Sequence, residues 1–211
     1  MSTYPVSERT KMKRGHKRAS YDVELVHSII DEAYICHVGA KMMDRPMVQP
    51  TAHWREGNKL YIHGSSKNGL FQTLIKGEEA CITITILDGL VMARSSFHHS
   101  ANYRSVMIFS KAKLIENRDE KKRLLNLMML KITPERFDEI REPNAKELKA
   151  TTVLEFDLVE VSAKVRTGPP VDDEEDYALP VWAGVTPLTL EKGKALDDPR
   201  WLDDHGKNDE E

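Results

Sequence analysis

The chain has 211 residues with a net charge of -3 at pH 7, and 40% of its residues are hydrophobic, which suits one domain with a substantial core. No apolar run is long enough to cross a bilayer, and the N-terminus lacks the apolar segment of a secretory signal. Cys36 and Cys81 both lie in apolar, strand-like runs. This indicates buried, reduced thiols in a cytoplasmic protein rather than a disulfide framework or a thiolate metal site.

Charge divides the chain into a basic arm, a body and an acidic tail. The arm is residues 1–19, and its segment from Arg9 to Arg18 reads RTKMKRGHKR. The tail is residues 169–211, with acidic runs at 172–176, 203–204 and 209–211. A basic arm can bind nucleic acid or acidic lipid. Because the rest of the chain shows no basic stripe, we expect instead a solvated arm, or one that pairs with the acidic end of a partner copy.

The body, residues 20–168, opens with a helix. Ser20 can cap it, and helical spacing relates the apolar residues Val23, Val26, Ile29, Ile30 and Ala33. The period then changes to that of strands, which are predicted at residues 34–40, 45–54 and 60–63. A hairpin turn at 56–59 joins the last two. A short helix at residues 68–76 ends at Gly77, a favourable C-cap.

The second half of the body continues this pattern. Alternating β-branched residues predict a strand at 80–87, Asp88 and Gly89 a tight turn, and residues 90–94 a continuation of the sheet. A polar link at 95–102 leads to a long strand at 103–115. A helix is predicted at 118–132, a short one from Pro134, and one turn at 144–149. The last strands are predicted at 152–161 and 163–167, after which regular structure ends.

Strands dominate this order, their connections are mostly hairpins, and helices lie at the ends. The pattern predicts a mainly β fold with peripheral α-helices, arranged as a small closed or partly closed antiparallel barrel rather than a doubly wound sheet.

A turn of small, polar and cationic residues connects a strand to a helix and predicts an anion site. Gly64 permits a close backbone approach, the hydroxyls of Ser65 and Ser66 can donate hydrogen bonds, and Lys67 adds a full charge. We call Ser65, Ser66 and Lys67 the serine turn. A phosphate would bind well there, although the same residue types also serve any strand-to-helix connection. The turn is neither a Walker loop nor a dinucleotide fingerprint.

Other residues could contribute to a site. Arg104 and Ser105 open a long strand expected across the barrel from the serine turn, and a guanidinium there could hold phosphate or form a surface salt bridge. Five histidines, at positions 37, 53, 63, 98 and 99, invite a metal or haem interpretation, but no helical His-x-x-x-His pair is present. Trp182, between two prolines, would either pack outside the barrel or cover a planar ligand. No nucleophile–base motif appears, so the catalytic residues stay unknown and a cofactor would carry the chemistry.

Four segments together resemble the pyridoxamine 5'-phosphate oxidase-like flavoproteins, in the branch that includes the nitroimidazole-resistance proteins. They are LYIHGSSKNGLFQTLIKG, DGLVMARSSFHHSANYRSV, AKVRTGPP and PVWAGVTPL. The resemblance spans residues 14–190. It implies a six-stranded split β-barrel that forms a homodimer, with FMN in a groove between the subunits.

The resemblance also assigns cofactor-binding roles. It places the FMN phosphate on the serine turn, and Arg104 and Ser105 on a second cofactor-binding strand. Gln49, Pro50 and Thr51 match the strand beside the flavin ring. Trp182 matches the C-terminal Trp of the superfamily, and His63 and Gly64 match the strand-end His-Gly of this branch.

The sequence departs from the family pattern at two places. Many relatives have Arg or Lys where this chain has Gly69 or Leu70, so Lys67 would have to substitute. The true oxidases follow their Trp with Gly-Gly-Tyr-Arg, whereas Ala183 to Thr186 lacks that Arg. This argues against pyridoxamine 5'-phosphate as the main substrate.

Several functions remain open. The leading one is an FMN-dependent oxidoreductase that acts on a small molecule, with NAD(P)H as the electron donor to test. The alternatives are a non-catalytic module that stores flavin, a haem or metal protein on the same barrel, and a nucleic-acid binder that uses the basic arm. No membrane partner is expected, and nucleic acid is disfavoured.

Overall fold

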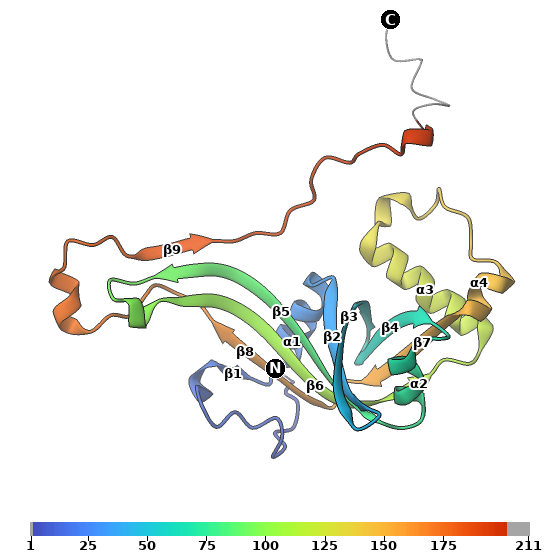
Figure 1. Ribbon diagram of the computed structural model, residues 1–211, viewed down its shortest axis with the longest axis horizontal. Coiled ribbons are helices and arrows are strands. Elements are labelled where there is room, and N and C mark those ends of the chain that lie inside the picture. Colours follow the sequence, from blue (N-terminus) through green and yellow to red (C-terminus); the bar gives the residue numbers. More distant parts are fainter. Residues whose placement is uncertain (1, 202–211) are drawn as a thin grey trace, which may run out of the picture.

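The chain forms one antiparallel sheet that closes on itself (Figure 1). The structure is a computed structural model and describes residues 2–201. The acidic runs predicted at residues 203–204 and 209–211 therefore lie outside the described residues. Within the described part, no helix combines the length and apolar character needed to span a membrane.

Six strands form a closed ring. They are hydrogen-bonded in the order β5–β6–β7–β4–β3–β2, and β2 pairs again with β5. Their bounds are β2 (Ile35–Met42), β3 (Arg45–Glu56), β4 (Lys59–Ser65), β5 (Glu79–Met92), β6 (Ser100–Leu114) and β7 (Thr151–Asp157). Three further strands extend the sheet: β1 (Ala19–Ser20), β8 (Glu160–Arg166) and β9 (Gly184–Pro187). The mainly β class and the six-stranded split barrel are confirmed.

The ring is split because two of its strands change partner along their length. β3 pairs with β2 through residues 45–52 and with β4 through residues 53–56. β6 pairs with β8 through residues 103–109 and with β7 through residues 112–114. The barrel therefore opens where each strand exchanges one neighbour for the other.

The helices fill the barrel end and cover one side. α1 (Val23–Glu32) and α2 (Gly69–Ile75) bury Ile29, Ile30 and Phe71 in the core that the ring encloses. α3 (Arg118–Ile132) packs Leu124 and Met128 on a second, smaller cluster with Trp54, Tyr61 and Val153. The short helix η3 (Pro134–Arg136) and α4 (Ala145–Ala150) follow α3. The structure confirms the helix predicted at residues 118–132, and the other predicted helices lie within a few residues of their expected bounds.

The predicted turn at Asp88 and Gly89 is wrong, since β5 continues through it. The pairing of β5 with β6 only shifts register between Leu87 and Gly89, as a β-bulge does. A Cβ on Gly89 would lie 3.0 Å from the Thr186 carbonyl oxygen on β9. The glycine therefore serves a close approach between two strands rather than a reversal of the chain.

The strand predicted at residues 152–161 is in fact two strands that meet at Leu158. The Leu158 N–H donates to the Asn58 carbonyl at 3.0 Å, and the Asn58 side chain donates to the Leu158 carbonyl at 2.6 Å. These bonds fix Leu158 to the β3–β4 hairpin, so the chain bends there. The bend lets β7 and β8 pair with successive parts of β6.

The acidic tail does not lack regular structure, which corrects the sequence prediction. Beyond the barrel, β5 and β6 run out as a projecting arm with η2 (Ser96–His98) at its tip, and β9 returns along β5 after η4 (Glu174–Ala178) (Figure 1). The buried Asp172 carboxylate accepts from the Arg94 guanidinium at 3.1 Å and from its backbone N–H at 2.9 Å. This ion pair anchors the tail to β5.

The basic N-terminal arm also packs on the body rather than being wholly solvated. Tyr4 is buried, and its hydroxyl donates to Asn58 at 2.5 Å. Arg9 pairs with Glu79 at 2.5 Å and with Glu160. The helix cap is likewise not Ser20: the Asp22 carboxylate accepts from the N–H of Leu25 at 2.8 Å and begins α1, because an aspartate next to the first helical residue caps it directly.

Candidate functional site

The candidate site lies where β3 and β4 separate. β4 pairs with β3 only through residues 59–62, and beyond this point its neighbour is β7 alone. Residues 45–52 of β3 consequently keep one edge without a strand partner in the described part of the chain. Such an edge leaves alternate backbone N–H and C=O groups free. Gln49, Pro50 and Thr51 lie on it, and Pro50, which has no N–H, is tolerated at an edge.

The open edge of β3 meets the serine turn through two contacts. Asn68, directly after the turn, donates from its side-chain amide to Gln49 Oε1 at 3.1 Å. The Thr51 hydroxyl contacts the His63 carbonyl oxygen at 3.5 Å. The structure therefore brings together Gln49, Thr51, His63 and the serine turn, which sequence reasoning assigned to one site from separate segments.

The backbone of the serine turn is fixed from within. The Ser65 hydroxyl accepts from the Lys67 N–H at 3.2 Å, and the Ser66 N–H donates to the Ala150 carbonyl at 2.9 Å. Asn68 caps α2 by accepting from the N–H groups of Leu70 and Phe71 at 2.9 and 3.2 Å. In contrast, the Ser66 hydroxyl and the exposed Lys67 ammonium have no hydrogen-bond or ion-pair partner within residues 2–201. Because the backbone of the serine turn is fixed while these two donors are unpaired, the turn is suited to binding an anion.

Gly64 packs closely against α2, and its predicted cofactor contact stays a prediction. A Cβ at this position would lie 3.0 Å from two ring carbons of Phe71. Phe71 is fully buried in the barrel core. Glycine is therefore required so that the first turn of α2 can lie against β4, and this packing sets the position of the serine turn.

His63 lies half-buried on β4, beside the open edge of β3. Its ring centroid is 6.0 Å from that of Trp54, and its Nδ1 atom is buried without a hydrogen-bond partner. Burial lowers the pKa of His63, so the ring is neutral at pH 7. A neutral imidazole with an unused ring nitrogen can accept a hydrogen bond or bind a metal.

Arg104 is held by carboxylates. Its guanidinium donates to Asp88 at 2.7 Å and to Glu32 at 2.7 Å, with further contacts to each. The hydrogen bonds that Arg104 donates, first to Glu32 and then to Asp88, raise the pKa of Arg104, and the bond to Glu32 lowers the pKa of Glu32. The salt-bridge interpretation of Arg104 is thus the one seen in the single chain. Its phosphate contact is untested, and we assign the phosphate to the serine turn instead.

Ser105 and Trp182 lie apart from the serine turn in the described chain. Ser105 pairs with Thr85 and Lys164 in the sheet, and its hydroxyl donates to the Lys164 carbonyl at 3.2 Å. Trp182 precedes β9 on the projecting arm and is 69% exposed. Its ring lies so close to Gly184 that a Cβ there would be 2.7 Å away. The cofactor roles of Ser105 and Trp182 remain predictions.

Comparison with known proteins identifies the family. The sequence model described as pyridoxamine 5'-phosphate oxidase matches residues 22–165, more than half of the chain. The chain belongs to the pyridoxamine 5'-phosphate oxidase family. The matched residues run from the N-cap of α1 almost to the end of β8, so they contain the whole six-stranded ring.

Two solved structures of family members are close relatives. A flavocytochrome, Anf3 from Azotobacter vinelandii, is 44% identical with a TM-score of 0.87, over 92% of this chain and 90% of that one. A FAD and haem binding protein from Mycobacterium smegmatis is 34% identical with a TM-score of 0.82, over 86% and 89% of the two chains.

A third relative shares the fold. It is a protein assigned to 5-nitroimidazole antibiotic resistance in Bacteroides thetaiotaomicron, 24% identical with a TM-score of 0.60, and the alignment covers 70% of this chain and 86% of that one. No curated protein matches the sequence.

The histidines do not form a metal cluster in the described chain. Within residues 2–201, no three His, Cys, Asp or Glu side chains converge on one point. His53 is buried, contacts the Ile30 carbonyl at 2.9 Å, and has its pKa lowered to about 4, chiefly by burial. His99 contacts the Ser95 carbonyl on the projecting arm. His63 therefore lies beside the open edge of this family member, and His37 lies opposite Pro50 in the β2–β3 ladder.

Sequence reasoning missed the double role of Asn68 and the partners of Arg104. Asn68 was recognised only as the start of a helix, and its contact with Gln49 joins residues that are 19 positions apart. Glu32 is 72 positions from Arg104. An asparagine before a helix signals a cap, but no local signal reveals either of these distant partners.

Proposed function

We propose that this chain is a flavin-dependent oxidoreductase that binds FMN at the open edge of β3. The phosphate would lie on the serine turn, bound by the Ser66 hydroxyl and the Lys67 ammonium. The flavin ring would run beside Gln49, Pro50 and Thr51. The observation that carries the proposal is the junction of the free β3 edge with the serine turn, made by the Asn68–Gln49 hydrogen bond at 3.1 Å.

The residues at this junction fit a flavin nucleotide. Unpaired donors suit the dianionic phosphate, and a free strand edge offers backbone donors and acceptors to the polar rim of the ring. Bound flavin would supply the exchange of electrons or hydride. The residues of the chain would hold and orient the flavin, and Trp182 would shield the flavin ring from water.

The absorption spectrum of the purified protein, with mass identification of the released chromophore, tests flavin binding. The result we expect is FMN at one per chain. The relative from M. smegmatis is named for FAD, and release of FAD would correct the nucleotide while leaving the redox proposal in place. A colourless protein that takes up neither flavin would overturn it.

Turnover separates an oxidoreductase from a flavin-storage module. We expect NADPH or NADH to reduce the bound flavin, and a nitroaromatic or quinone to reoxidise it. Two negative results together would favour storage. Neither donor would reduce the flavin, and no acceptor of a broad panel would reoxidise chemically reduced flavin. Cys36 and Cys81 are free thiols, which supports a reducing, cytoplasmic location for this activity.

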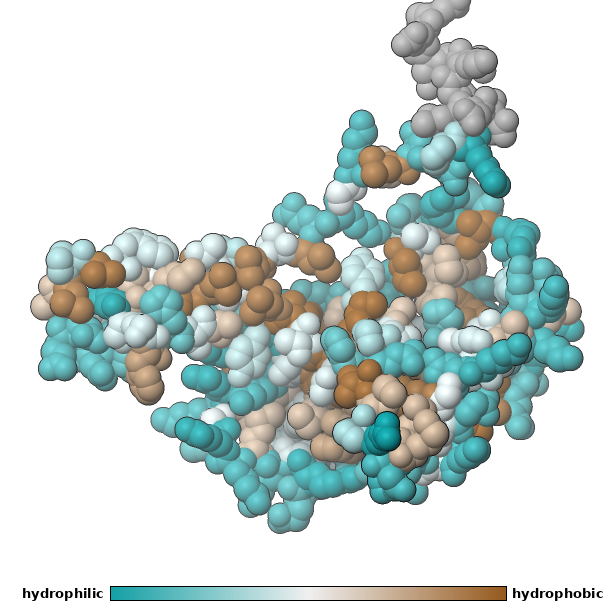
Figure 2. Space-filling model, viewed as in Figure 1, coloured by the Kyte–Doolittle hydropathy of each residue, from teal (hydrophilic) through white to brown (hydrophobic). Residues whose placement is uncertain are grey.

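We also propose that the chain acts as a homodimer with the flavin between subunits. Apolar side chains are exposed around the open edge, including Val48, 62% exposed on β3, and Ile35 on β2. Figure 2 shows further hydrophobic surface along the projecting arm. Exposed apolar surface of this extent favours association with another protein chain. Light scattering on the purified protein would give twice the chain mass, and a monomer at all concentrations would contradict this part.

Haem is a second candidate ligand, favoured by His63. Its imidazole is kept neutral by burial and its Nδ1 atom has no partner, which is the form that coordinates iron. Two relatives above 30% identity are a flavocytochrome and a FAD and haem binding protein. A Soret band that is lost in His63→Ala and kept in His99→Ala would support the candidate. A haem content unaffected by His63→Ala would reject His63 as the ligand.

A further inference from the structure

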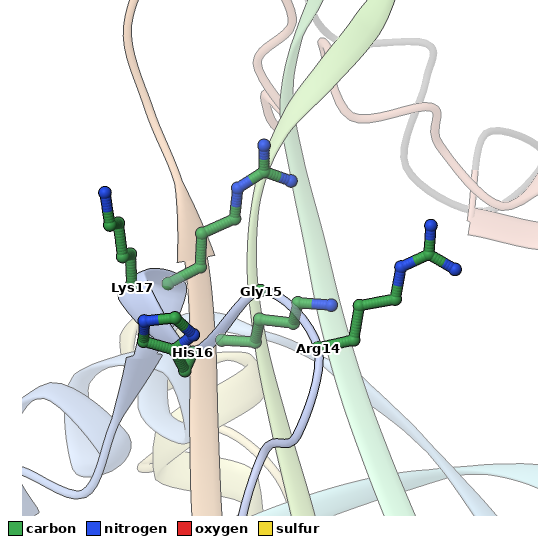
Figure 3. Close-up of a pocket in the computed structure, with 6 residues that line it drawn as sticks. Arg14, Gly15, His16 and Lys17 are labelled. Atoms are coloured by element: carbon green, nitrogen blue, oxygen red, sulfur yellow. The ribbon is translucent and has the colours of Figure 1, made fainter.

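A pocket of about 490 Å³ lies between the basic loop, residues 14–18, and strand β8, away from the open edge of β3. We call it the basic pocket. It is lined by Arg14, Gly15, His16, Lys17, Arg18 and Lys164. Four of these six residues carry a permanent positive charge, and none is acidic. Figure 3 shows the side chains of Arg14 and Lys17 on either side of Gly15 in the basic loop.

The cations of the basic pocket lack carboxylate partners. Within residues 2–201, the side chains of Arg14, Lys17, Arg18 and Lys164 make no ion pair or hydrogen bond. Several other arginines of this chain pair with carboxylates, as Arg55 does with Asp31 at 2.5 Å and Arg94 with Asp172 at 3.1 Å. The basic pocket differs in that four such cations line one cavity. The chain as a whole carries a net charge of -3. The concentration of positive charge is therefore local, and an anion would relieve the repulsion within it.

The protein fixes the backbone of the basic loop from both ends. Tyr21 donates its hydroxyl to the Thr10 carbonyl at 2.9 Å, and Thr10 is buried. After the loop, Ala19 pairs with Lys164 in the sheet. Gly15 adopts a φ of 71°, and the Arg18 N–H donates to its carbonyl at 2.9 Å to close the turn. An ordered backbone reduces the entropy cost of gathering these side chains on a ligand.

The basic pocket borders the strand that the family resemblance assigns to cofactor binding. Lys164 lies opposite Ser105 in the β6–β8 ladder, and the Ser105 hydroxyl donates to the Lys164 carbonyl at 3.2 Å. Residues directly opposite each other in an antiparallel pair point to the same face. Lys164 and Ser105 therefore share one face of the sheet.

We infer that the basic pocket binds the diphosphate group of a nucleotide. Arginine forks bind phosphate oxygens in pairs and lysines add point charges, so four cations match two adjacent phosphates better than one monoester. The pocket is concave and confined to one loop and one strand, whereas a nucleic-acid backbone requires a stripe of charge. The diphosphate has two sources, a separate nucleotide or the dinucleotide form of the flavin. The second rests on the flavin binding of the proposed function, but it would place the ribityl phosphate in the basic pocket instead of on the serine turn.

Two matched double variants test this assignment. Arg14→Gln/Lys17→Gln removes two charges that line the pocket, and Lys11→Gln/Lys13→Gln removes two charges from the same segment outside it. Lys164→Gln removes the contribution of β8. ADP, pyrophosphate and a single-stranded oligonucleotide are titrated calorimetrically into the full-length protein as purified, at low ionic strength, because salt screens such contacts. Retention of FAD and of FMN is measured on the same samples.

A separate nucleotide predicts that ADP binds at least tenfold more weakly to Arg14→Gln/Lys17→Gln and to Lys164→Gln. The Lys11→Gln/Lys13→Gln control would change less than threefold, and flavin content would be constant. A dinucleotide flavin predicts that the pocket variants lose FAD but retain FMN. Both results support the basic pocket as a diphosphate site.

Four results overturn the inference. They are equal losses in pocket and control variants, loss of FMN together with FAD, binding of the oligonucleotide alone, and no change in any ligand. A protein that binds no flavin at all would contradict the proposed function, while the ADP titration would still decide the role of the basic pocket.

Discussion

The serine turn and the Arg104 cluster, which is Arg104 with Asp88 and Glu32, each contain a cation, and both resemble cofactor-binding segments. Only the cation of the Arg104 cluster has protein partners in the described chain. At the serine turn, the backbone is satisfied while the Lys67 ammonium and Ser66 hydroxyl have no partner in the described chain. In the Arg104 cluster, Asp88 and Glu32 occupy the guanidinium on both sides. A charge that already has protein partners stabilises the fold, whereas an ordered but unpaired one is available to a ligand.

The support beneath each region also differs. Apolar packing of Phe71 against Gly64 positions the serine turn, whereas ion pairs between α1, β5 and β6 position Arg104. Packing is insensitive to pH and salt, while ion pairs respond to both. The two regions should therefore respond differently to mutation, acid and ionic strength.

Removing the packing under the serine turn should have the largest effect. Phe71 is 1% exposed, and Phe71→Ala should lower the free energy of unfolding by about 3–5 kcal/mol, because it leaves a cavity in the core. Urea unfolding measures this loss. Phe97→Ala is the control, since Phe97 is 88% exposed and its loss should change stability by less than about 0.5 kcal/mol. Equal effects of the two variants would refute the packing account.

Arg104→Ala should destabilise the fold by about 1–2 kcal/mol at pH 7, because hydrogen bonds to charged groups are lost and two carboxylates are left facing each other. Arg104 holds the pKa of Glu32 below its ordinary value of 4.5. This stabilisation is therefore fully present above pH 4.5 and is lost as the pH falls through the lower folded-state pKa.

Unfolding curves of wild type and Arg104→Ala across this pH range measure the difference in their free energies of unfolding. This difference should become smaller in acid. Arg118→Ala, at the exposed start of α3, should stay close to wild type. If the free energy of unfolding of wild type exceeded that of Arg104→Ala by more in acid than at pH 7, the ion-pair role of Arg104 would be contradicted.

In contrast to Arg104→Ala, which should lower stability, Lys67→Ala should weaken flavin binding and leave the free energy of unfolding unchanged. Loss of one charge-assisted contact to phosphate should raise the flavin dissociation constant about tenfold, or about 1.4 kcal/mol. Lys76→Ala, at the C-cap of α2 and away from the serine turn, should leave the flavin dissociation constant unchanged. Fluorescence titration of the apoprotein measures both variants. If Arg104→Ala weakens flavin binding more than Lys67→Ala does, the two regions have been assigned the wrong way round.

Ionic strength should produce the smallest effect. Because Lys67 is exposed, raising salt from low to physiological levels should weaken flavin binding by roughly threefold through screening. The same titration on Lys67→Ala should lose most of this dependence. Salt dependence of equal size in that variant would mean that other cations, such as those of the basic pocket, hold the phosphate.

Local sequence patterns predicted the helices and most strands, because apolar periodicity is set by neighbouring residues. The helix at 118–132 is found with the same bounds. The errors occur where a distant partner decides the local structure. β5 passes straight through Asp88 and Gly89 because β9 packs on it, and the chain bends at Leu158 because Asn58 holds it.

The candidate site divides in the same way. The serine turn is recognisable from residues 60–74 alone, since the strand, the small residues and the helix follow one another. The open β3 edge and the neutralisation of Arg104 are not, because they depend on where β3 leaves β4 and on Glu32 reaching across from α1. Charge counts in a sequence do not show which charges the fold will neutralise.

A crystal structure of the protein with bound flavin tests the central assignment most directly. We expect the phosphate oxygens within hydrogen-bond distance of the Ser66 hydroxyl and the Lys67 ammonium, and the ring along Gln49 to Thr51. Arg104 should still contact Asp88 and Glu32. A flavin phosphate bound by a freed Arg104, with the serine turn facing only solvent, would contradict the account.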